Sequence, residues 1–333
     1  MDLLFLYLGL GVLLVLLIAA LWISRYAYEK CFYSPNEGRN TDPYGHMGGA
    51  QYRAVQPKIT ASVKFMDGTP FEWVKITSFD GLTLWGRYYH FRDGAPVNIL
   101  FHGYRSMSLR DCAGGFALSA QVYFNVLAVD ERAQGRSEGK TITFGIRERW
   151  DCLRWANYVT ERFGAETPIL LSGLSMGGTV VLMASELDLP RNVVGILADC
   201  PFATPSHIIQ KVCKEQGYPP KVLLPFIRLG ALLFGHFLLD QTTASKAVAH
   251  AKVPILIIHG QEDYFVPWEM SREIKAHCVS PARLELFPKA GHGLSYLTDS
   301  ERYERVCMEF FDQIPELRPF IQENPLVKER LGK

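Results

Sequence analysis

Short, continuous apolar runs recur along this chain, and helix-sized stretches separate most of them. Runs of this kind are typical of strands that are buried on both faces of a parallel sheet. The strand candidates are Trp73–Ser78, Leu82–Tyr89, Val97–Phe101, Asn125–Val129, Ile169–Ser172, Val193–Ala198, Ile255–His259 and Leu284–Phe287. The helix-sized stretches are 109–122, 144–163, 177–187, 267–277 and 299–313. This alternation predicts an α/β fold with a mostly parallel, doubly wound sheet and helices on both faces.

Two regions depart from the alternation. The pair Asp80-Gly81 lies between the first two strands and is a hairpin turn signal, so these strands are expected to form an antiparallel edge. Residues 201–250 hold much apolar material but no clear strand, which predicts a small helical cap inserted over the C-terminal edge of the sheet. The most apolar part of this cap, 222–239, contains proline, arginine and histidine. It therefore favours packed helices or a lid that touches lipid over a second membrane span.

The N-terminal segment from Leu3 to Ile23 contains no charged residue. A helix of about 20 apolar residues is long enough to span a membrane. A cleaved signal peptide is the alternative, but Asp2 stands where a basic region is usual and the apolar run is too long. The sequence therefore predicts a single-pass membrane helix.

Charges after this segment indicate its orientation. Arg25, Lys30 and Arg39 follow it and are partly offset by Glu29 and Glu37. Because positive charge gathers on the cytoplasmic side of membranes, the domain that follows the helix is expected in the cytoplasm.

The remaining composition excludes several kinds of partner. The net charge is +1, which gives no reason to expect a nucleic-acid partner. The seven cysteines are scattered without C-x-x-C spacing, so neither a zinc site nor a disulfide framework is expected. The predicted organisation is an anchor at 1–30, a linker at 31–65 with loose structure, a main domain at 66–318 and a tail at 319–333.

The sequence Gly173-Leu-Ser-Met-Gly177 lies between a predicted strand and a predicted helix. In this context the pattern G-x-S-x-G indicates a sharp turn that raises the central serine above the sheet. Ser175 is therefore a candidate nucleophile, and the glycines on both sides leave room for a strained backbone. A plain turn or a phosphate-binding loop is the alternative, but the G-x-x-x-x-G-K-[ST] pattern is absent from the sequence.

A serine hydroxyl needs a base, and the base needs a group that orients it. His292 follows the last predicted strand between two glycines, and Asp263 follows the strand before it. The order Ser175, Asp263, His292 is the order of Ser-Asp-His triads in α/β-hydrolases. Asp199 also ends a strand and is the alternative acid, although we favour an orienting role for it.

Other residues near strand ends receive supporting roles. His259 is expected to hold the Asp263 loop, and His102 to fix the loop that follows the Val97–Phe101 strand. The backbone N–H groups of Tyr104 and Met176 are expected to form an oxyanion hole.

The segment 126–139, which carries Asp130, Arg132, Gly135 and Ser137, is expected to form a structural loop network rather than to bind substrate.

Five motifs together closely resemble those of the α/β-hydrolase superfamily over residues 70 to 315. They are HGYRS, DERAQGRSEG, GLSMGG, HGQEDYFVP and AGHG. The set looks most like membrane-anchored bacterial α/β-hydrolases related to the Bem46/ABHD13-like group and to serine aminopeptidase families. The usual D-x-R-G-x-G-x-S pattern is altered, because Ala133-Gln134 replaces the first glycine and its neighbour. The resemblance implies an α/β-hydrolase fold and an esterase, lipase, thioesterase or peptidase that uses no cofactor or metal.

The resulting hypothesis is a serine hydrolase on a membrane anchor that cleaves an acyl ester of a small molecule or lipid. A peptidase for short peptides and a non-catalytic, membrane-tethered binding protein are the alternatives. Glu215 and Asp240 are the only acidic residues between 201 and 250, which gives little support for binding a peptide amine. The sequence leaves the oligomeric state open.

Overall fold

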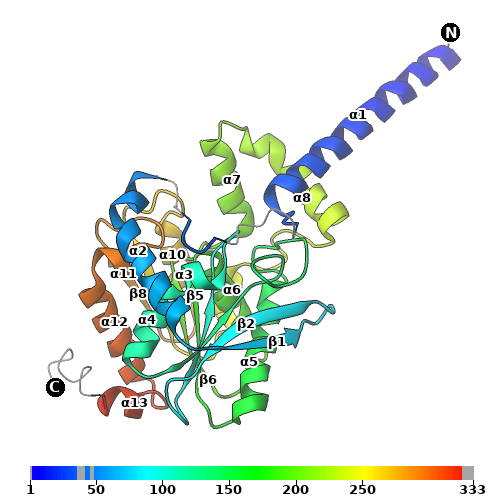
Figure 1. Ribbon diagram of the computed structural model, residues 1–333. Helices are drawn as coiled ribbons and strands as arrows, with labels where there is room; N and C mark the ends of the chain where they lie inside the picture. Colours follow the sequence, from blue (N-terminus) through cyan, green and yellow to red (C-terminus); the bar gives the residue numbers. More distant parts are fainter. Residues whose placement is uncertain (1, 36–41, 46–48, 325–333) are drawn as a thin grey trace.

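A computed structural model describes the chain except for residues 1, 36–41, 46–48 and 325–333. Its centre is an eight-stranded sheet in the order β1-β2-β4-β3-β5-β6-β7-β8 (Figure 1). The strands are β1 (Glu72–Thr77), β2 (Thr83–Tyr89), β3 (Val97–Phe101), β4 (Asn125–Val129), β5 (Ile169–Leu174), β6 (Val193–Asp199), β7 (Ile255–Gly260) and β8 (Ala282–Phe287). The β1–β2 hairpin forms an antiparallel edge, β2 pairs antiparallel with β4, and all later pairs are parallel. The predicted α/β fold and its edge hairpin are therefore confirmed.

Helices cover both faces of the sheet, and its central strands are buried along almost their whole length. One face packs against α5 (Glu148–Phe163), α6 (Met176–Ala184) and α10 (Glu269–His277). The opposite face packs against α4 (Ala113–Gln121), α12 (Ser300–Gln313) and α13 (Arg318–Gln322). The short helices α3 (Ser108–Asp111) and α11 (Ser295–Thr298) lie at the edge where the parallel strands end.

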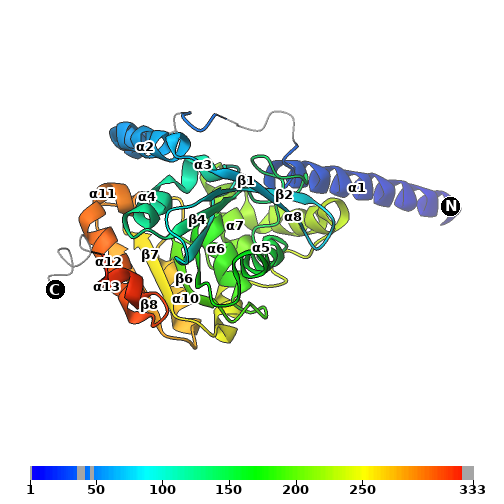
Figure 2. The same cartoon turned by 60° about the horizontal axis from the view of Figure 1, so that its bottom comes forward.

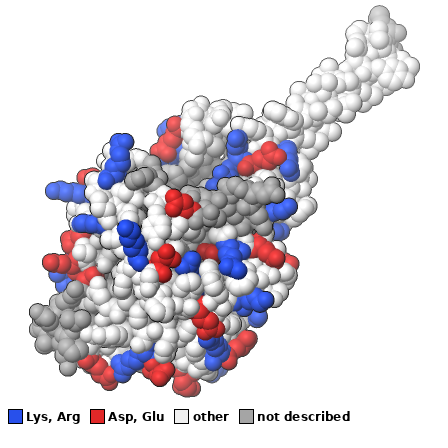
Figure 3. All heavy atoms as spheres, viewed as in Figure 1, with Lys and Arg blue, Asp and Glu red and all other residues white. Residues whose placement is uncertain are grey.

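The helix α1 (Asp2–Cys31) projects away from the domain (Figure 2). Within its segment Leu3–Cys31, the most apolar window of 18 residues has a mean hydropathy of 2.9 and is not buried in the protein. Figure 3 shows that most of its length carries no charged side chain. By length and composition, α1 is a candidate membrane span, and a signal sequence has the same features. Arg39 and Glu37, which entered the orientation argument, lie outside the described residues.

The end of α1 is part of the folded domain and not a free tether. Tyr28 and Phe32 are buried, and the Tyr28 hydroxyl hydrogen-bonds Thr141 Oγ1 at 2.7 Å. The backbone N–H of Ile142 donates to the carbonyl of Phe32 at 2.8 Å. The last turns of α1 therefore hold the exposed apolar part of this helix directly beside the domain.

The prediction of loose structure over 31–65 is wrong for its second half. Residues Ala50–Gly68 form the helix α2, whose buried Val63 and Met66 pack with α4. Pro57 lies inside this helix and, with the glycine-rich sequence before it, argues against a helix from sequence alone. Packing on α3 and α4 outweighs that local preference. Residues 36–41 and 46–48 of the expected linker, and 325–333 of the expected tail, lie outside the described residues.

Residues 201–250 contain helices, as the sequence predicted. They form α7 (Pro205–Glu215), α8 (Pro220–Gly235), α9 (Ala244–Ala247) and the short 3-10 helix η1 (Val248–His250). The close approach of α8 to α1 requires Gly230, because a Cβ there would lie 2.4 Å from the carbonyl oxygen of Ser24. The apolar sequence of α8 is therefore explained in part by packing against α1.

Candidate active site

Ser175 occupies a sharp turn between β5 and α6. Its φ of 53° and ψ of −114° are outside the regions that residues with a side chain usually adopt. Two backbone hydrogen bonds stabilise this strained conformation. The N–H of Ser175 donates to the carbonyl of Asp199, and the carbonyl of Ser175 accepts from the N–H of Thr179. The turn lifts the hydroxyl to the C-terminal edge of the sheet, at the N-terminus of α6.

Two glycines make this turn sterically feasible. A Cβ on Gly173 would lie 2.2 Å from the backbone of Gly177, and one on Gly177 would lie 2.2 Å from the carbonyl oxygen of Phe101. These contacts involve backbone atoms, which cannot rotate away. The G-x-S-x-G pattern is therefore required by the close approach of β5, α6 and the end of β3.

His292 and Asp263 complete a hydrogen-bonded series with Ser175. His292 Nε2 lies 2.9 Å from Ser175 Oγ, and His292 Nδ1 lies 2.7 Å from Asp263 Oδ2. Asp263 Oδ1 accepts from the N–H groups of Phe265 and Val266, which fixes the carboxylate. The structure thus brings together the three residues that the sequence singled out.

Asp263 is held in its charged form. Burial alone would raise its pKa, but the hydrogen bonds from His259 and His292 outweigh burial and hold the pKa well below its usual value. An ionised carboxylate at Nδ1 favours the tautomer in which Nε2 is free to accept a proton from Ser175.

The two alternative residues occupy different positions. His259 lies against the Asp263 loop, where its Nε2 is 2.9 Å from the Val266 carbonyl and its Nδ1 is 2.7 Å from Ser271 Oγ. Asp199 does not contact His292 through any hydrogen bond found among the described residues; the hydroxyl of Tyr303 hydrogen-bonds it instead.

The residues expected to support an oxyanion hole lie around Ser175. Met176 is the first residue of α6, so its N–H has no carbonyl partner within the helix. Tyr104 follows β3 and lines the same cavity as Ser175. His102 fixes the start of this loop, because its Nε2 accepts from the N–H of Glu131 at 3.0 Å. Asp111 Oδ2 also accepts from the N–H of Gly103 at 2.9 Å, a contact that the sequence did not reveal.

The end of α1 holds the Tyr104 loop, which sequence reasoning also missed. The Tyr104 hydroxyl donates to the carbonyl of Cys31 at 2.8 Å. The Arg105 guanidinium donates to the carbonyls of Lys30 and Tyr33, each at 3.0 Å. The last carbonyls of a helix lack partners within it and carry partial negative charge, so a hydroxyl and a guanidinium suit them. The apolar helix is thereby connected to the loop beside Ser175.

The segment 126–139 forms a network of loops. Arg132 is buried and pairs with Asp151 at 2.5 Å and with Asp80 at 2.8 Å. Asp130 accepts from the N–H groups of Ser108 and Arg136, each at 2.9 Å. Ala133, where the family pattern has glycine, has a φ of 60°. The glycine of the pattern is explained by this left-handed conformation, which alanine adopts here with some strain.

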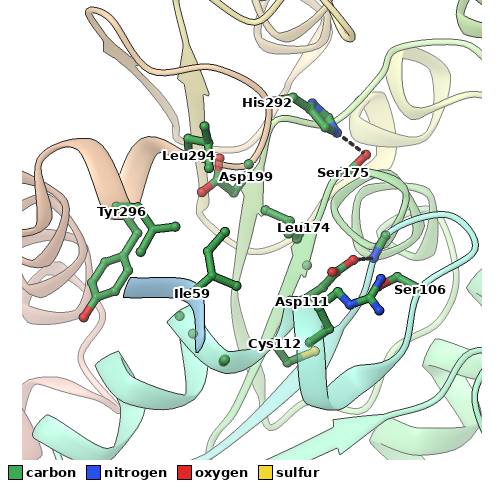
Figure 4. A pocket seen from close by; sticks show the side chains of 18 of the residues that line it. Ile59, Ser106, Asp111, Cys112, Leu174, Ser175, Asp199, His292, Leu294 and Tyr296 are labelled. Carbon is green, nitrogen blue, oxygen red and sulfur yellow. Dashed lines mark hydrogen bonds between the residues drawn. The ribbon is translucent and has the colours of Figure 1, made fainter. Parts of the chain in front are cut away.

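A cavity of about 550 Å³ opens beside Ser175 and His292. Its walls come from the end of β5, the Tyr104 loop, α4, α11 and the unexpected helix α2 (Figure 4). Tyr52 of α2 reaches the site directly, since its hydroxyl donates to the carbonyl of His292 at 3.0 Å. A cavity of this size lined mainly by apolar side chains is typical of a small-molecule site.

The cluster fits proton transfer better than metal binding. Cys200, Asp263 and His292 place potential ligand atoms within 4.8 Å of one another. Burial raises the pKa of the Cys200 thiol well above its usual value, so the thiol stays protonated, whereas a metal binds the thiolate. Asp263 and His292 are already hydrogen-bonded to each other.

Comparison with known proteins agrees with this architecture. The model of the alpha/beta hydrolase family matches residues 99–307. The protein YqkD of Bacillus subtilis is 24% identical over 77% of this chain and 83% of its own length. The bifunctional esterase/perhydrolase DCH of Acinetobacter calcoaceticus is 23% identical over 71% of this chain and 98% of its own. By contrast, the chain spans about half the length of YfhR from Escherichia coli (53%), with 25% identity.

Solved structures share the fold. The esterase Pf2001 of Pyrococcus furiosus superimposes with a TM-score of 0.61 at 21% identity, covering 75% of this chain and 94% of that one. Since the family model matches more than half of the chain, on a sheet of the expected topology, the chain belongs to the alpha/beta hydrolase family.

Proposed function

We propose that this protein is a serine hydrolase that cleaves carboxylic esters through an acyl-enzyme. The observation that carries the proposal is the hydrogen-bonded series from Asp263 through His292 to Ser175 on a strained turn. Ser175 Oγ attacks the ester carbonyl while His292 Nε2 takes its proton, and His292 returns that proton to the departing alcohol. Water then attacks the acyl-enzyme by the same route, which releases the carboxylic acid and restores Ser175.

Asp263 and two N–H groups complete the proposed mechanism. The Asp263 carboxylate stabilises the imidazolium that forms on His292. The N–H groups of Tyr104 and Met176 donate to the oxyanion, and each such donor is worth about 10²–10³ in rate.

The paired acidic residues of the cap favour an ester over a peptide. Peptide recognition would be helped by an unpaired carboxylate from the cap, but Glu215 pairs with Lys211 and Asp240 pairs with Arg228. Neither acidic residue is among the described residues that line the cavity. The esterase names of DCH and Pf2001 support the same class of substrate.

Turnover of p-nitrophenyl acyl esters by the full-length chain in detergent tests this function. Ser175→Ala should abolish turnover, and Asp263→Asn should lower kcat by about 10⁴. Asp188→Asn, at an exposed surface residue, is the matched control and should keep full activity. Undiminished turnover by Ser175→Ala would refute the mechanism. Labelling by a fluorophosphonate separates the two kinds of protein, because an enzyme with an activated serine reacts with it and a non-catalytic binding protein does not.

We also propose that α1 anchors the domain at the cytoplasmic face of a membrane. The exposed apolar surface of α1 and the basic residues Arg25 and Lys30 near its C-terminal end support this orientation. Protease digestion of intact cells and of inverted vesicles tests it. The domain should be cleaved only in inverted vesicles, and cleavage in intact cells or release as a truncated soluble protein would contradict the anchor.

A further inference from the structure

Four buried polar atoms in residues of the cavity wall lack hydrogen-bond partners within the described part of the chain. They are Ser106 Oγ, Arg110 Nε, Ser172 Oγ and Asp199 Oδ1, and the last two lie on neighbouring strands of the sheet. Ser172 and Asp199 each expose only 5% of their surface. Buried polar atoms are nearly always hydrogen-bonded, so an unpartnered pair facing a cavity marks a place for a polar group of a ligand.

Ser172 and Asp199 lie on one face of the sheet, at different depths in the cavity. Ser172 and Leu174 are two residues apart on β5, so both side chains point to the same face. Leu174 pairs with Asp199 across β5 and β6, and the carbonyl of Asp199 accepts from the N–H of Ser175, so Asp199 lies beside the proposed nucleophile. Ser172 lies two residues before Leu174, which places it about 7 Å farther along the strand. Figure 4 shows Asp199 beside Leu294 and near Leu174.

Apolar side chains form much of the cavity wall around this pair. They include Ile59, Leu100, Leu174, Leu197, Leu294 and Leu297. A hydrocarbon chain extending from a carbonyl at Ser175 would therefore lie against apolar walls, with the Asp199 carboxyl and the deeper Ser172 hydroxyl as hydrogen-bonding groups along its course.

The chemistry of the pair fits a neutral hydroxyl better than a charged group. Burial raises the pKa of Asp199 to about 7, so near neutral pH the carboxyl is often protonated and can donate or accept. The Ser172 hydroxyl can also donate and accept. An ammonium group has three donors, whereas Asp199 and Ser172 together offer two unpartnered oxygens; a hydroxyl has one donor and can also accept.

We propose that the cavity binds an acyl chain that carries a hydroxyl group, and that Asp199 and Ser172 hydrogen-bond this hydroxyl while Ser175 reacts with the ester. This inference rests on the proposed function, because it assigns the substrate class of the same site. Asp199 and Ser172 are specificity-determining residues and take no part in bond breaking.

Paired p-nitrophenyl esters test the proposal with the full-length chain in detergent. Within each pair the acyl chains have equal length and end in a hydroxyl or a methyl group. Because p-nitrophenol is the leaving group throughout, only the acyl chain varies. At the best-fitting length, kcat/KM should be at least about tenfold higher for the hydroxylated ester, the value of one good hydrogen bond.

Ser172→Ala should reduce this preference to near unity. Ser280→Ala is the matched control, because Ser280 Oγ is also buried without a partner but lies outside the cavity lining. It should keep the preference. Equal kcat/KM for both esters at every length, or an unchanged preference in Ser172→Ala, would overturn the proposal. A stronger preference for an acyl chain ending in an amine would overturn it too.

Binding to Ser175→Ala separates this proposal from the proposed function. Calorimetry with the same ester pairs requires no turnover, and the hydroxylated ester should bind about tenfold more tightly. If the hydroxylated ester binds more tightly than the methyl-ended ester but the wild type turns over neither, the esterase function is rejected and the proposed hydroxyl-binding role of the cavity stands. Turnover without any preference in rate or binding would reject the cavity assignment alone.

Discussion

The strained backbone at Ser175 predicts that the residue proposed for catalysis lowers the stability of the protein. At φ 53° and ψ −114°, a side chain costs about 1–3 kcal/mol, and glycine avoids this cost. The informative comparison is Ser175→Gly against Ser175→Ala. Both variants remove the hydroxyl and its hydrogen bond to His292, so that loss cancels between them.

The expected difference follows from two opposing effects. Relief of strain favours glycine by about 1–3 kcal/mol. The greater freedom of glycine in the unfolded chain opposes this by about 0.4–1 kcal/mol. At the middle of these two ranges, Ser175→Gly should be more stable than Ser175→Ala by about 1.3 kcal/mol.

Urea unfolding of the full-length variants in detergent, followed by tryptophan fluorescence, measures this difference. Ser119 provides the control, because it is buried in the regular helix α4. There the order should reverse, with Ser119→Gly about 1 kcal/mol less stable than Ser119→Ala. If Ser175→Gly is no more stable than Ser175→Ala, the backbone at this turn is not strained and the reasoning fails.

Three further predictions concern residues around the site. Arg132→Ala should lower the free energy of unfolding by about 3–5 kcal/mol, because it leaves the buried carboxylate of Asp151 unpaired. A change below about 1 kcal/mol in urea unfolding would contradict this prediction. Tyr104→Phe removes the hydrogen bond to Cys31 and should lower kcat about 3- to 10-fold with little change in KM, because a positioning loss acts on the transition state. An effect on KM alone would show that the hydrogen bond from Tyr104 to Cys31 does not position the Tyr104 loop. Burial raises the pKa of Asp199 from 3.8 to about 7, so its contribution to the free energy of unfolding is full below pH 3.8 and is lost as the pH rises through about 7. Asp199→Asn should make the free energy of unfolding less dependent on pH between these values. An unchanged pH dependence in this variant would show that Asp199 does not have a raised pKa.

The fold was predictable where local sequence decides structure. The runs Val97–Phe101 and Asn125–Val129 are apolar throughout, and the structure has strands with those bounds. Because parallel strands end at the same edge of the sheet, the residues after β5, β7 and β8 could be expected to meet. The distances among Ser175, Asp263 and His292 agree with that expectation.

What the sequence did not reveal depends on contacts between distant segments. The helix α2 contains Pro57 and is held by packing on α4, so its own sequence predicts it poorly. The hydrogen bond from Tyr52 to His292 joins residues 240 positions apart, and no local pattern signals it. The link between Tyr104 and Cys31 is equally non-local. A fragment starting near residue 60 would lose both contacts, so the full chain is the proper material for assays.

The central claim is that Ser175 forms a covalent acyl-enzyme. Peptide mass mapping after reaction with a fluorophosphonate tests it most directly, because this reagent captures an activated serine through the same attack. The account predicts a single adduct on Ser175 in the wild type, which should be lost in Ser175→Ala and strongly slowed in Asp263→Asn. An adduct on another residue, or none on Ser175 in a wild type that still hydrolyses esters, would contradict it.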